Sequence, residues 1–198
     1  MFVTPQAESV LELFRSTGAY LQGHFRLTSG LHSAEYLQSA LVLQHPAAAE
    51  KLGRLLAEEL RKTSGEKIGL VAAPALGGMI IGHEVARALG TPFIFTERDA
   101  ARKMALRRGF AAGSGETAVV VEDVITTGGS TLEVIEILKE AGVHVLAAGS
   151  IIDRSGGHAN VGVPRVALAT LQVAAHYPDA CPLCKLGISV EKPGSRPA

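Results

Sequence analysis

The feature that most constrains the fold is an alternation, from residue 68 onwards, of short apolar segments with segments of helical spacing. The apolar segments lie at 68–73, 92–96, 116–123, 144–153 and 165–173, and segments with helical spacing lie among them at 78–90 and 130–142. Unbroken apolar strands connected through helices are typical of a mostly parallel sheet that is covered on both faces. We therefore expect an α/β fold with a mostly parallel central sheet and helices on both faces.

The first part of the chain is predicted to form two helices with a smaller unit between them. Thr4 and Pro5 are typical of an N-cap and a first helical turn, and Gly18 ends the helix that they begin, at about Thr17. A second helix, with leucines at helical spacing, is expected at 46–62. The chain of 198 residues is expected to be one domain. We divide it into a small antiparallel hood at about 18–45, a core at about 46–175 and a C-terminal tail at 176–198.

Composition and charge narrow the class of protein. The formal net charge is +0, from 19 basic and 19 acidic residues, so charge provides no reason to expect a nucleic-acid partner. No apolar run approaches the roughly 20 residues of a membrane helix, and the first residues do not resemble a signal peptide. The 2 cysteines, Cys181 and Cys184, exclude a framework of disulfides. We expect a cytoplasmic enzyme or binding protein without membrane contact.

The segment VVVEDVITTGGST, at 119–131, places two carboxylates at the end of an apolar strand and a loop of small residues after them. In open α/β sheets ligands bind at the carboxyl ends of strands, where Glu122 and Asp123 are expected. The loop at 126–130 leads into a helix N-terminus, whose free N–H groups and dipole attract an anion. A phosphate there would repel the carboxylates, so they need sugar hydroxyls or a hydrated Mg²⁺ as partners. The segment predicts a ribose-phosphate site, with a plain acidic cap before a helix as the alternative.

Two other nucleotide-binding motifs are excluded. Gly77 and Gly82 have the spacing of a Walker loop, but His83 and Glu84 follow where that loop has Lys and Ser or Thr. A G-x-G-x-x-G fingerprint after a strand is absent from the sequence, which argues against a dinucleotide-binding fold.

The segment VVVEDVITTGGS resembles the phosphoribosyl diphosphate (PRPP) motif of the type I phosphoribosyltransferases, in which an apolar strand, an acid pair and a Thr/Gly phosphate loop follow one another. Within that superfamily, three further segments resemble the orotate phosphoribosyltransferases: FRLTSGLHSAEYLQ at 25–38, APALGG at 73–78 and SIIDRSGG at 150–157. The resemblance extends over most of the chain, from about residue 14 to residue 157.

The resemblance implies a role for each matching residue. Glu122 and Asp123 would hold the ribose hydroxyls, with Mg²⁺ bound together with PRPP near them. The rest of the PRPP site would consist of Val124, Ile125, Thr126, Thr127, Gly128, Gly129 and Ser130 around the 5′-phosphate, and of Ala75, Leu76, Gly77 and Gly78 as the pyrophosphate loop. Orotate would be bound by Thr126, Arg154 and Tyr36. From the residues alone, Arg154 could instead form a surface salt bridge with Asp153, and Tyr36 could be a core residue.

The sequence also departs from the family pattern. Familiar bacterial members have lysines where this chain has Thr28 and Gly77. The family's mobile loop contains a histidine, which is absent from the polar segment at 97–115. The loop cations Arg98, Arg102, Lys103, Arg107 and Arg108 are candidates for assisting the leaving group, and we expect Arg98, Arg102 and Lys103, with Asp123, to be the catalytic set. The alternative is a solvated loop.

The resemblance further implies an activity and an assembly. The expected reaction transfers the 5-phosphoribosyl group of PRPP to orotate, which yields orotidine 5′-monophosphate and diphosphate in pyrimidine synthesis. A homodimer is expected, with the loop at 97–115 of one subunit completing the site of the other. A purine phosphoribosyltransferase and a regulator that binds PRPP without turnover are the alternatives.

The segment CPLC, Cys181 to Cys184, resembles half of a zinc site. A tetrahedral site needs four ligands, and His176 is the nearby residue that would add a third. A role in packing a small turn is the favoured interpretation of this segment, and zinc binding is the alternative.

Overall fold

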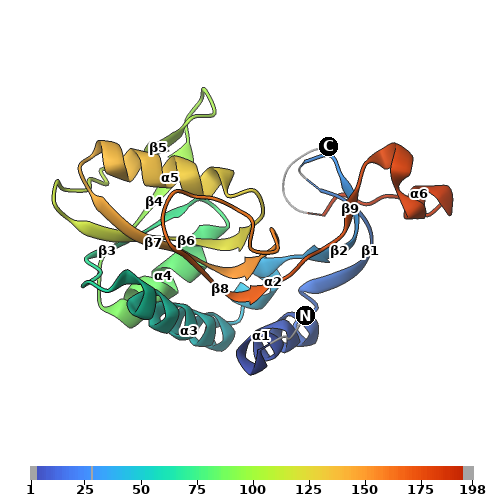
Figure 1. Ribbon diagram of the computed structural model, residues 1–198, viewed down its shortest axis with the longest axis horizontal. Coiled ribbons are helices and arrows are strands. Elements are labelled where there is room, and N and C mark those ends of the chain that lie inside the picture. Colours follow the sequence, from blue (N-terminus) through green and yellow to red (C-terminus); the bar gives the residue numbers. More distant parts are fainter. Residues whose placement is uncertain (1–3, 28, 194–198) are drawn as a thin grey trace.

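The computed structural model describes residues 4–27 and 29–193 and contains a large mixed sheet and a small antiparallel one (Figure 1). The large sheet has the strand order β5-β4-β3-β6-β7-β8. Its strands are β3 (Leu70–Pro74), β4 (Phe93–Arg98), β5 (Met104–Leu106), β6 (Thr117–Ile125), β7 (His144–Asp153) and β8 (Arg165–Thr170). All pairs in this sheet are parallel except β4 with β5. The predicted fold class is therefore confirmed.

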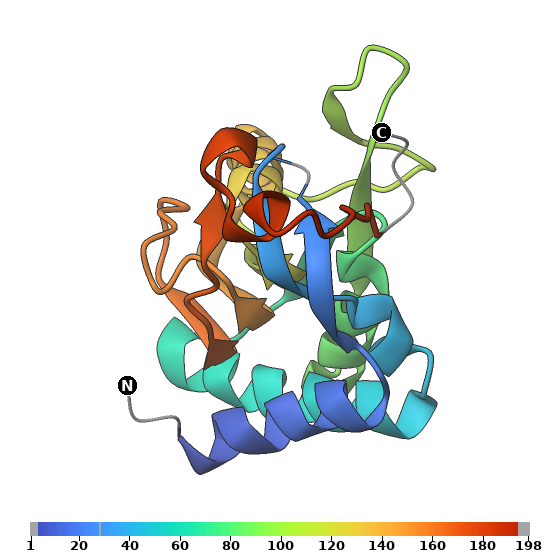
Figure 2. The same ribbon diagram turned by 90° about the vertical axis from the view of Figure 1, so that its right-hand side faces the viewer.

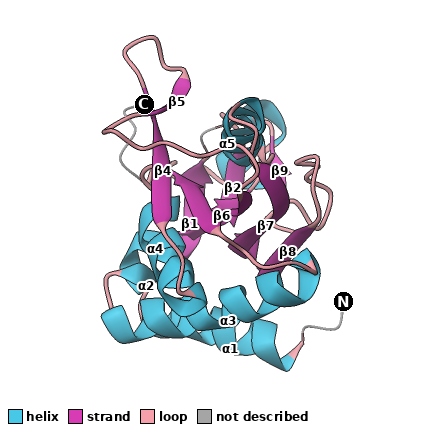
Figure 3. Ribbon diagram, turned by 90° about the vertical axis from the view of Figure 1, so that its left-hand side faces the viewer, coloured by secondary structure: helices cyan, strands magenta, loops and turns pink. Residues whose placement is uncertain are grey.

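Helices cover both faces of this sheet (Figure 3). The helices α1 (Pro5–Ser16), α3 (Pro46–Ser64) and α4 (Gly78–Leu89) lie on one face, and α5 (Gly129–Glu140) lies on the other. Side chains of a strand alternate between faces, so Val119 and Val121 of β6 pack into the first core and Ala118 and Val120 into the second. Burial on both faces explains why the strand sequence is apolar without interruption.

Capping residues in the sequence determine where the helices begin and end. The Thr4 hydroxyl accepts a hydrogen bond of 3.1 Å from the Ala7 amide, and Pro5 occupies the first turn of α1. Gly65 ends α3 in the left-handed conformation, with φ +66°, which glycine adopts without the steric cost that other residues meet. The predicted ends of α1 and α3 agree with the structure to within two residues.

The small sheet consists of β1 (Tyr20–Arg26), β2 (His32–Leu37) and β9 (Ala175–His176), all antiparallel (Figure 2). We call this sheet, with α2 (Ser39–Leu43) after it, the hood. Its third strand comes from the end of the chain, which the sequence analysis treats as a separate tail. The tail continues through a 3₁₀ turn (Pro178–Ala180) and α6 (Pro182–Lys185), and Glu191 then pairs with Phe25 of β1.

The segment at 97–115, predicted as a long loop, begins as a β-hairpin. Strand β4 extends to Arg98, and β5 returns antiparallel to it, with Arg98 opposite Met104. The turn between them is closed by Asp99, which accepts a hydrogen bond of 2.9 Å from the Lys103 amide through Oδ1. The hairpin projects from the body of the molecule (Figures 1 and 3). The prediction of a loop throughout was wrong because β5 has only 3 residues, with charged residues on either side of it, and so short a segment shows no alternation.

Candidate functional site

The acid pair lies within β6, which continues past it to Ile125. Glu122 is buried and Asp123 is half-buried. Burial raises the pKa of Glu122 well above its ordinary value, and the neighbouring Asp123 charge raises it further. Burial likewise raises the pKa of Asp123. Two carboxylates that are desolvated side by side favour a cation or hydroxyl donors as a ligand.

The loop after β6 leads directly into α5. Gly128 is the N-cap of that helix with φ +82°, and a Cβ atom there would lie 2.7 Å from Val161 Cγ1. Thr126 and Thr127 are exposed, and Ser130 is half-buried in the first turn. The N-terminal amides of α5 and three hydroxyls are therefore presented together, as an anion site requires.

A cavity of about 730 Å³ lies between this loop and the hood, within the size range of small-molecule sites. The structure brings together here most of the residues that the sequence predicts for the ribose, the phosphate and the base. Its lining consists of Leu27, Ser29, Leu31, Tyr36, Leu37, Gln38, Arg98, Asp123, Val124, Thr126, Thr127, Gly129, Ser130, Glu133 and Arg154. Three predicted members do not line it. Glu122, Ile125 and Gly128 are all buried.

Arg154 is a half-buried cation in the cavity wall. Its Nε atom is buried, and no residue that the structure describes accepts a hydrogen bond from it. Asp153, the salt-bridge partner considered from the sequence, instead forms a 2.5 Å ion pair with Arg165. Burial lowers the pKa of Arg154. A guanidinium without a partner in a cavity is suited to a planar anionic ligand.

Tyr36 lies in the same wall, with its ring centroid 5.9 Å from that of Phe25. Burial raises the pKa of its hydroxyl, so the ring is neutral around pH 7. The next residue, Leu37, is 6% exposed and belongs mainly to the core. Tyr36 is therefore the aromatic face available to a flat ligand on this side of the cavity.

Three of the four residues predicted as the pyrophosphate loop, Ala75, Leu76 and Gly77, line an adjoining hollow of about 400 Å³, and Gly78 does not. Residues of this hollow are Ala75, Leu76, Gly77, Glu97, Arg98, Met104 and Ser130. Gly77 packs against the acid pair, because a Cβ atom there would lie 2.6 Å from Asp123 Oδ1. Gly78 begins α4 and approaches the backbone of β6, where a Cβ atom would lie 2.8 Å from the Val121 oxygen. Glycine at both positions lets the backbone approach Asp123 and β6 closely.

The predicted catalytic cations are divided between two places. Arg98 lines both hollows and forms two hydrogen bonds of 3.0 Å with the Glu133 carboxylate of α5. Arg102 and Lys103, at the hairpin tip, line neither, and lie with Glu136 in a separate hollow of about 380 Å³. The structure therefore brings Arg98 to the acid pair and phosphate loop, but not Arg102 or Lys103.

The remaining loop cations are paired with a carboxylate. Arg107 and Arg108 lie 3.3 Å and 2.9 Å from the oxygens of Glu97. The guanidinium of Arg108 also lies 5.8 Å from the centre of the Phe95 ring. Arg98 is paired in the same way with Glu133, so these contacts do not distinguish the preferred cations Arg98, Arg102 and Lys103 from Arg107 and Arg108, and the catalytic set stays a prediction.

Several site residues were not predicted individually. Glu133 of α5 forms an ion pair with Arg98, but the sequence gives no sign that these two residues meet. Ser29 and Gln38 line the cavity because the hood folds over it, and they belong to the segment at 25–38 that resembles the family. Thr28, where familiar bacterial members of the family have a lysine, lies outside the described residues.

The fold and the cavity, with its phosphate loop, acid pair and glycine floor, define a type I phosphoribosyltransferase, and the profile of the phosphoribosyl transferase domain family matches residues 39–161. The orotate phosphoribosyltransferase of Desulforamulus reducens is 50% identical over 189 residues, which are 96% of this chain and 97% of that protein. The orotate phosphoribosyltransferase of Thermotoga petrophila is 49% identical over 187 residues, 94% of this chain and 98% of that protein. The chain belongs to the orotate phosphoribosyltransferases.

Solved structures agree with this assignment. The crystal structure of orotate phosphoribosyltransferase from Aeropyrum pernix is 27% identical, with a TM-score of 0.69, and the match covers 90% of this chain and 98% of that one. Within the described residues, helices long and apolar enough to cross a membrane are absent.

Proposed function

We propose that this chain transfers the 5-phosphoribosyl group from PRPP to orotate, which yields orotidine 5′-monophosphate and diphosphate. The observation that carries the choice of base is Arg154, which lines the cavity and whose buried Nε has no acceptor among the described residues. Orotate is a flat ring with a carboxylate and carbonyl oxygens. The guanidinium fork would bind its acidic edge, and the Tyr36 ring would lie against its face.

The remaining residues of the cavity position the ribose phosphate. The amides at the start of α5, with Thr126, Thr127 and Ser130, would hold the 5′-phosphate, and Asp123 would accept hydrogen bonds from ribose hydroxyls. Departure of diphosphate builds positive charge on the ribose ring, which the Asp123 carboxylate would stabilise. Gly77 and Gly78 would allow the diphosphate to approach the backbone near α4. Arg98 lies where the two hollows meet, and there its charge would face the leaving group.

The donor set is compatible with Mg²⁺, which prefers carboxylate and phosphate oxygens. Asp123 lines the cavity and provides one carboxylate, and the buried Glu122 carboxylate is its neighbour in β6. Burial has raised the pKa of both groups, and a divalent cation nearby would offset that cost. When bound with PRPP, Mg²⁺ would neutralise charge that develops on the departing diphosphate.

We propose in addition that the enzyme works as a cytoplasmic homodimer. The support for a dimer is that Arg102 and Lys103 lie at the tip of a projecting hairpin and line no part of the cavity of their own chain. In a dimer the hairpin would reach the partner's diphosphate hollow. The support for the cytoplasm is that both cysteines are free, as expected in a reducing compartment.

An assay with PRPP and Mg²⁺ tests the function. Consumption of orotate, with release of diphosphate, is expected, and adenine, guanine and hypoxanthine tested in parallel should remain unchanged. Turnover of a purine base instead of orotate would support a purine phosphoribosyltransferase. Tight PRPP binding without turnover of any base would support a regulator.

A further inference from the structure

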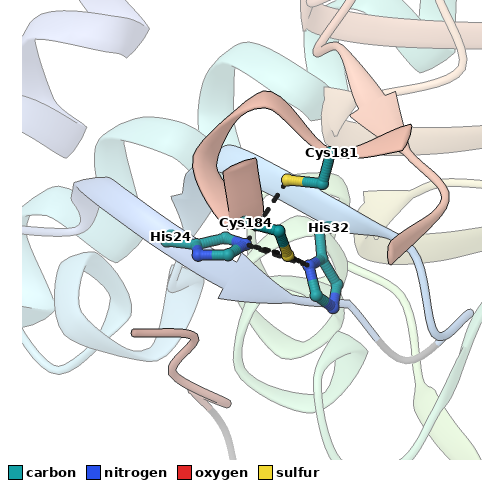
Figure 4. A group of neighbouring side chains, drawn as sticks. All are labelled: His24, His32, Cys181 and Cys184. Atoms are coloured by element: carbon teal, nitrogen blue, oxygen red, sulfur yellow. Dashed lines mark hydrogen bonds between the residues drawn. The ribbon is translucent and has the colours of Figure 1, made fainter. Parts of the chain in front are cut away.

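Four metal-ligating side chains from distant parts of the chain converge at the outer edge of the hood (Figure 4). His24 comes from β1, His32 begins β2, and Cys181 and Cys184 flank the start of α6. One ligand atom from each residue lies within 4.8 Å of all the others. The Nε2 atom of His24 is 2.9 Å from Nδ1 of His32, and that Nδ1 atom is 3.2 Å from Sγ of Cys184.

These distances are close to those between the ligands of a zinc ion. Tetrahedral zinc with Zn–N bonds of about 2.05 Å and Zn–S bonds of about 2.3 Å separates nitrogen from sulfur by about 3.6 Å and the two nitrogens by about 3.3 Å. The His24 Nε2 atom lies 3.5 Å from Cys181 Sγ and 3.7 Å from Cys184 Sγ. A small outward movement of the two imidazoles would therefore admit the ion.

The ring of His24 is already held in the orientation and tautomer that a metal ligand needs. Its Nδ1 atom lies 2.8 Å from the carbonyl oxygen of Ile188, so the N–H group on Nδ1 donates to that oxygen. The lone pair is then on Nε2, which faces the two sulfurs. A backbone carbonyl in this role is a usual outer partner of a metal-bound histidine.

The structure of the C-terminal tail around these four side chains suggests what a metal would do here. The tail around the cluster has little apolar core, since Tyr177 and Leu186 are 71% and 73% exposed. It is joined to the hood by short backbone pairing, of His32 with His176 and of Arg26 with Glu191. Small units without a sufficient core are commonly stabilised by a structural metal or by disulfides.

We propose that His24, His32, Cys181 and Cys184 bind a structural Zn²⁺ ion that fastens the C-terminal tail to the hood. Two thiolates and two imidazoles in a closed tetrahedral arrangement are a typical donor set for structural zinc, without an open position for catalysis. The ion would hold β1 and β2, the strands that carry Tyr36 and lead to Leu27, against the substrate cavity. His176, the ligand considered from the sequence, is not part of the cluster.

Metal content of the full-length chain, purified without a histidine tag and dialysed against metal-free buffer, tests the proposal. About one zinc ion per chain is expected for the wild type, and loss of nearly all of it for Cys184→Ser. The matched control is His176→Gln, because His176 lies opposite His32 in the sheet but contributes no ligand atom to the cluster. This control should keep its zinc. Wild-type protein without zinc, or with the same zinc content in Cys184→Ser, would overturn the proposal.

A second measurement does not depend on whether the cysteine variant folds. Reduced wild-type protein stripped of metal should, on addition of Co²⁺, develop the intense visible bands of tetrahedral cobalt and the near-ultraviolet band of thiolate ligands, both of which Zn²⁺ abolishes. His176→Gln should show the same spectrum. Weak octahedral cobalt bands alone, or a Cys181–Cys184 disulfide in protein prepared under reducing conditions, would show that the residues form no zinc site.

Discussion

Arg154 is the residue on which recognition of the base depends in the proposed function. Replacement by alanine leaves a substrate carboxylate without its partner in a cavity, which costs about 2–5 kcal/mol. We expect Arg154→Ala to raise the KM for orotate at least about thirtyfold, with a smaller change in the Kd for PRPP. Steady-state kinetics and calorimetry measure the two effects.

Two variants serve as controls for this change. Arg154→Lys keeps the charge but loses the planar fork, and it should fall between the wild type and the alanine variant. Arg15→Ala removes an exposed arginine that pairs with Glu8 on α1, and it should leave orotate kinetics unchanged. Near-normal kinetics of Arg154→Ala would remove the main support for orotate as the base.

Glu122 makes the stability of the ligand-free protein depend on pH. Its pKa in the folded chain is raised well above the ordinary value, first by burial. Below the ordinary pKa of about 4.3 the side chain is neutral in both the folded and unfolded states. As pH rises from there through the raised pKa, the unfolded state loses its proton first, so stability falls.

We therefore expect Glu122→Gln to raise the Tm of the ligand-free protein, by an amount that grows as pH increases from 4.5 to 8. Thermal unfolding across this range measures the effect. Glu58→Gln, which changes an exposed glutamate of α3, should follow the wild type throughout. If the Tm difference between Glu122→Gln and the wild type is the same at every pH, the prediction is wrong. That result would mean that ionising Glu122 costs the folded state no stability.

At the scale of the element, the loop at 126–130 and the start of α5 form the proposed anion site, and a substitution of Thr127 tests that proposal. Its side chain is exposed, so Thr127→Val removes a hydroxyl from the proposed anion site at little cost in stability. We expect the Kd for PRPP to rise about tenfold, with an unchanged Tm. The control Thr63→Val, near the end of α3, should alter neither. Unchanged PRPP affinity in Thr127→Val, measured by calorimetry, would contradict the assignment of this loop.

The neighbouring substitution Gly128→Val is not an equivalent test, although from the sequence alone one would expect it to leave the fold intact as well. Gly128 has φ +82°, and an added Cβ would lie 2.7 Å from Val161 Cγ1. Strain and overlap would destabilise the start of α5 itself. Loss of PRPP binding in Gly128→Val therefore does not separate binding from folding.

Among the secondary-structure elements, strands that are buried on both faces are the easiest to predict from the sequence. Strands β3, β6 and β7 are buried on both faces, and their unbroken apolar residues indicate a parallel sheet directly. The hairpin of β4 and β5 was not predicted, because five cations conceal a short strand. The phosphate loop and acid pair could be proposed from the sequence because their residues are contiguous, whereas the pairing of Arg98 with Glu133 joins residues 35 positions apart.

At the scale of the whole molecule, substitutions in the hairpin at 97–115 test the proposed homodimer. Arg102→Ala and Lys103→Ala should lower kcat more than they raise KM, because negative charge on the leaving group grows toward the transition state. Arg102→Ala and Asp123→Asn should each be inactive as homodimers. Mixing the two should restore activity, because one site of a heterodimer combines an intact acid pair with an intact hairpin.

Verified subunit exchange is the control for this mixture, and two differently tagged wild-type chains measure its extent. Absence of recovery after full exchange would place the hairpin over the cavity of its own subunit.

The cluster of His24, His32, Cys181 and Cys184 was the feature predicted least well, because its members are far apart in the sequence. Cys181 and Cys184 are three residues apart and resemble half a site, but Cys181 is 157 residues from His24. No spacing rule relates such partners. His176 was considered because it is near in sequence, and the pairing of β2 with β9 brings His32 to the cluster instead.

The origin of β9 at the end of the chain has a consequence for how the protein is made in the cell. The strands β1 and β2 leave the ribosome early, but their partner strand and the pairing with Glu191 are synthesised only after every strand of the central sheet. We therefore expect the central sheet to begin folding during translation, before the wall that carries Tyr36 is complete. A product truncated by a premature stop before residue 175 is expected to keep the loops after β3 and β6 and to lack the third strand of the hood. The late synthesis of β9 would then make this wall one of the last parts of the proposed orotate site to form.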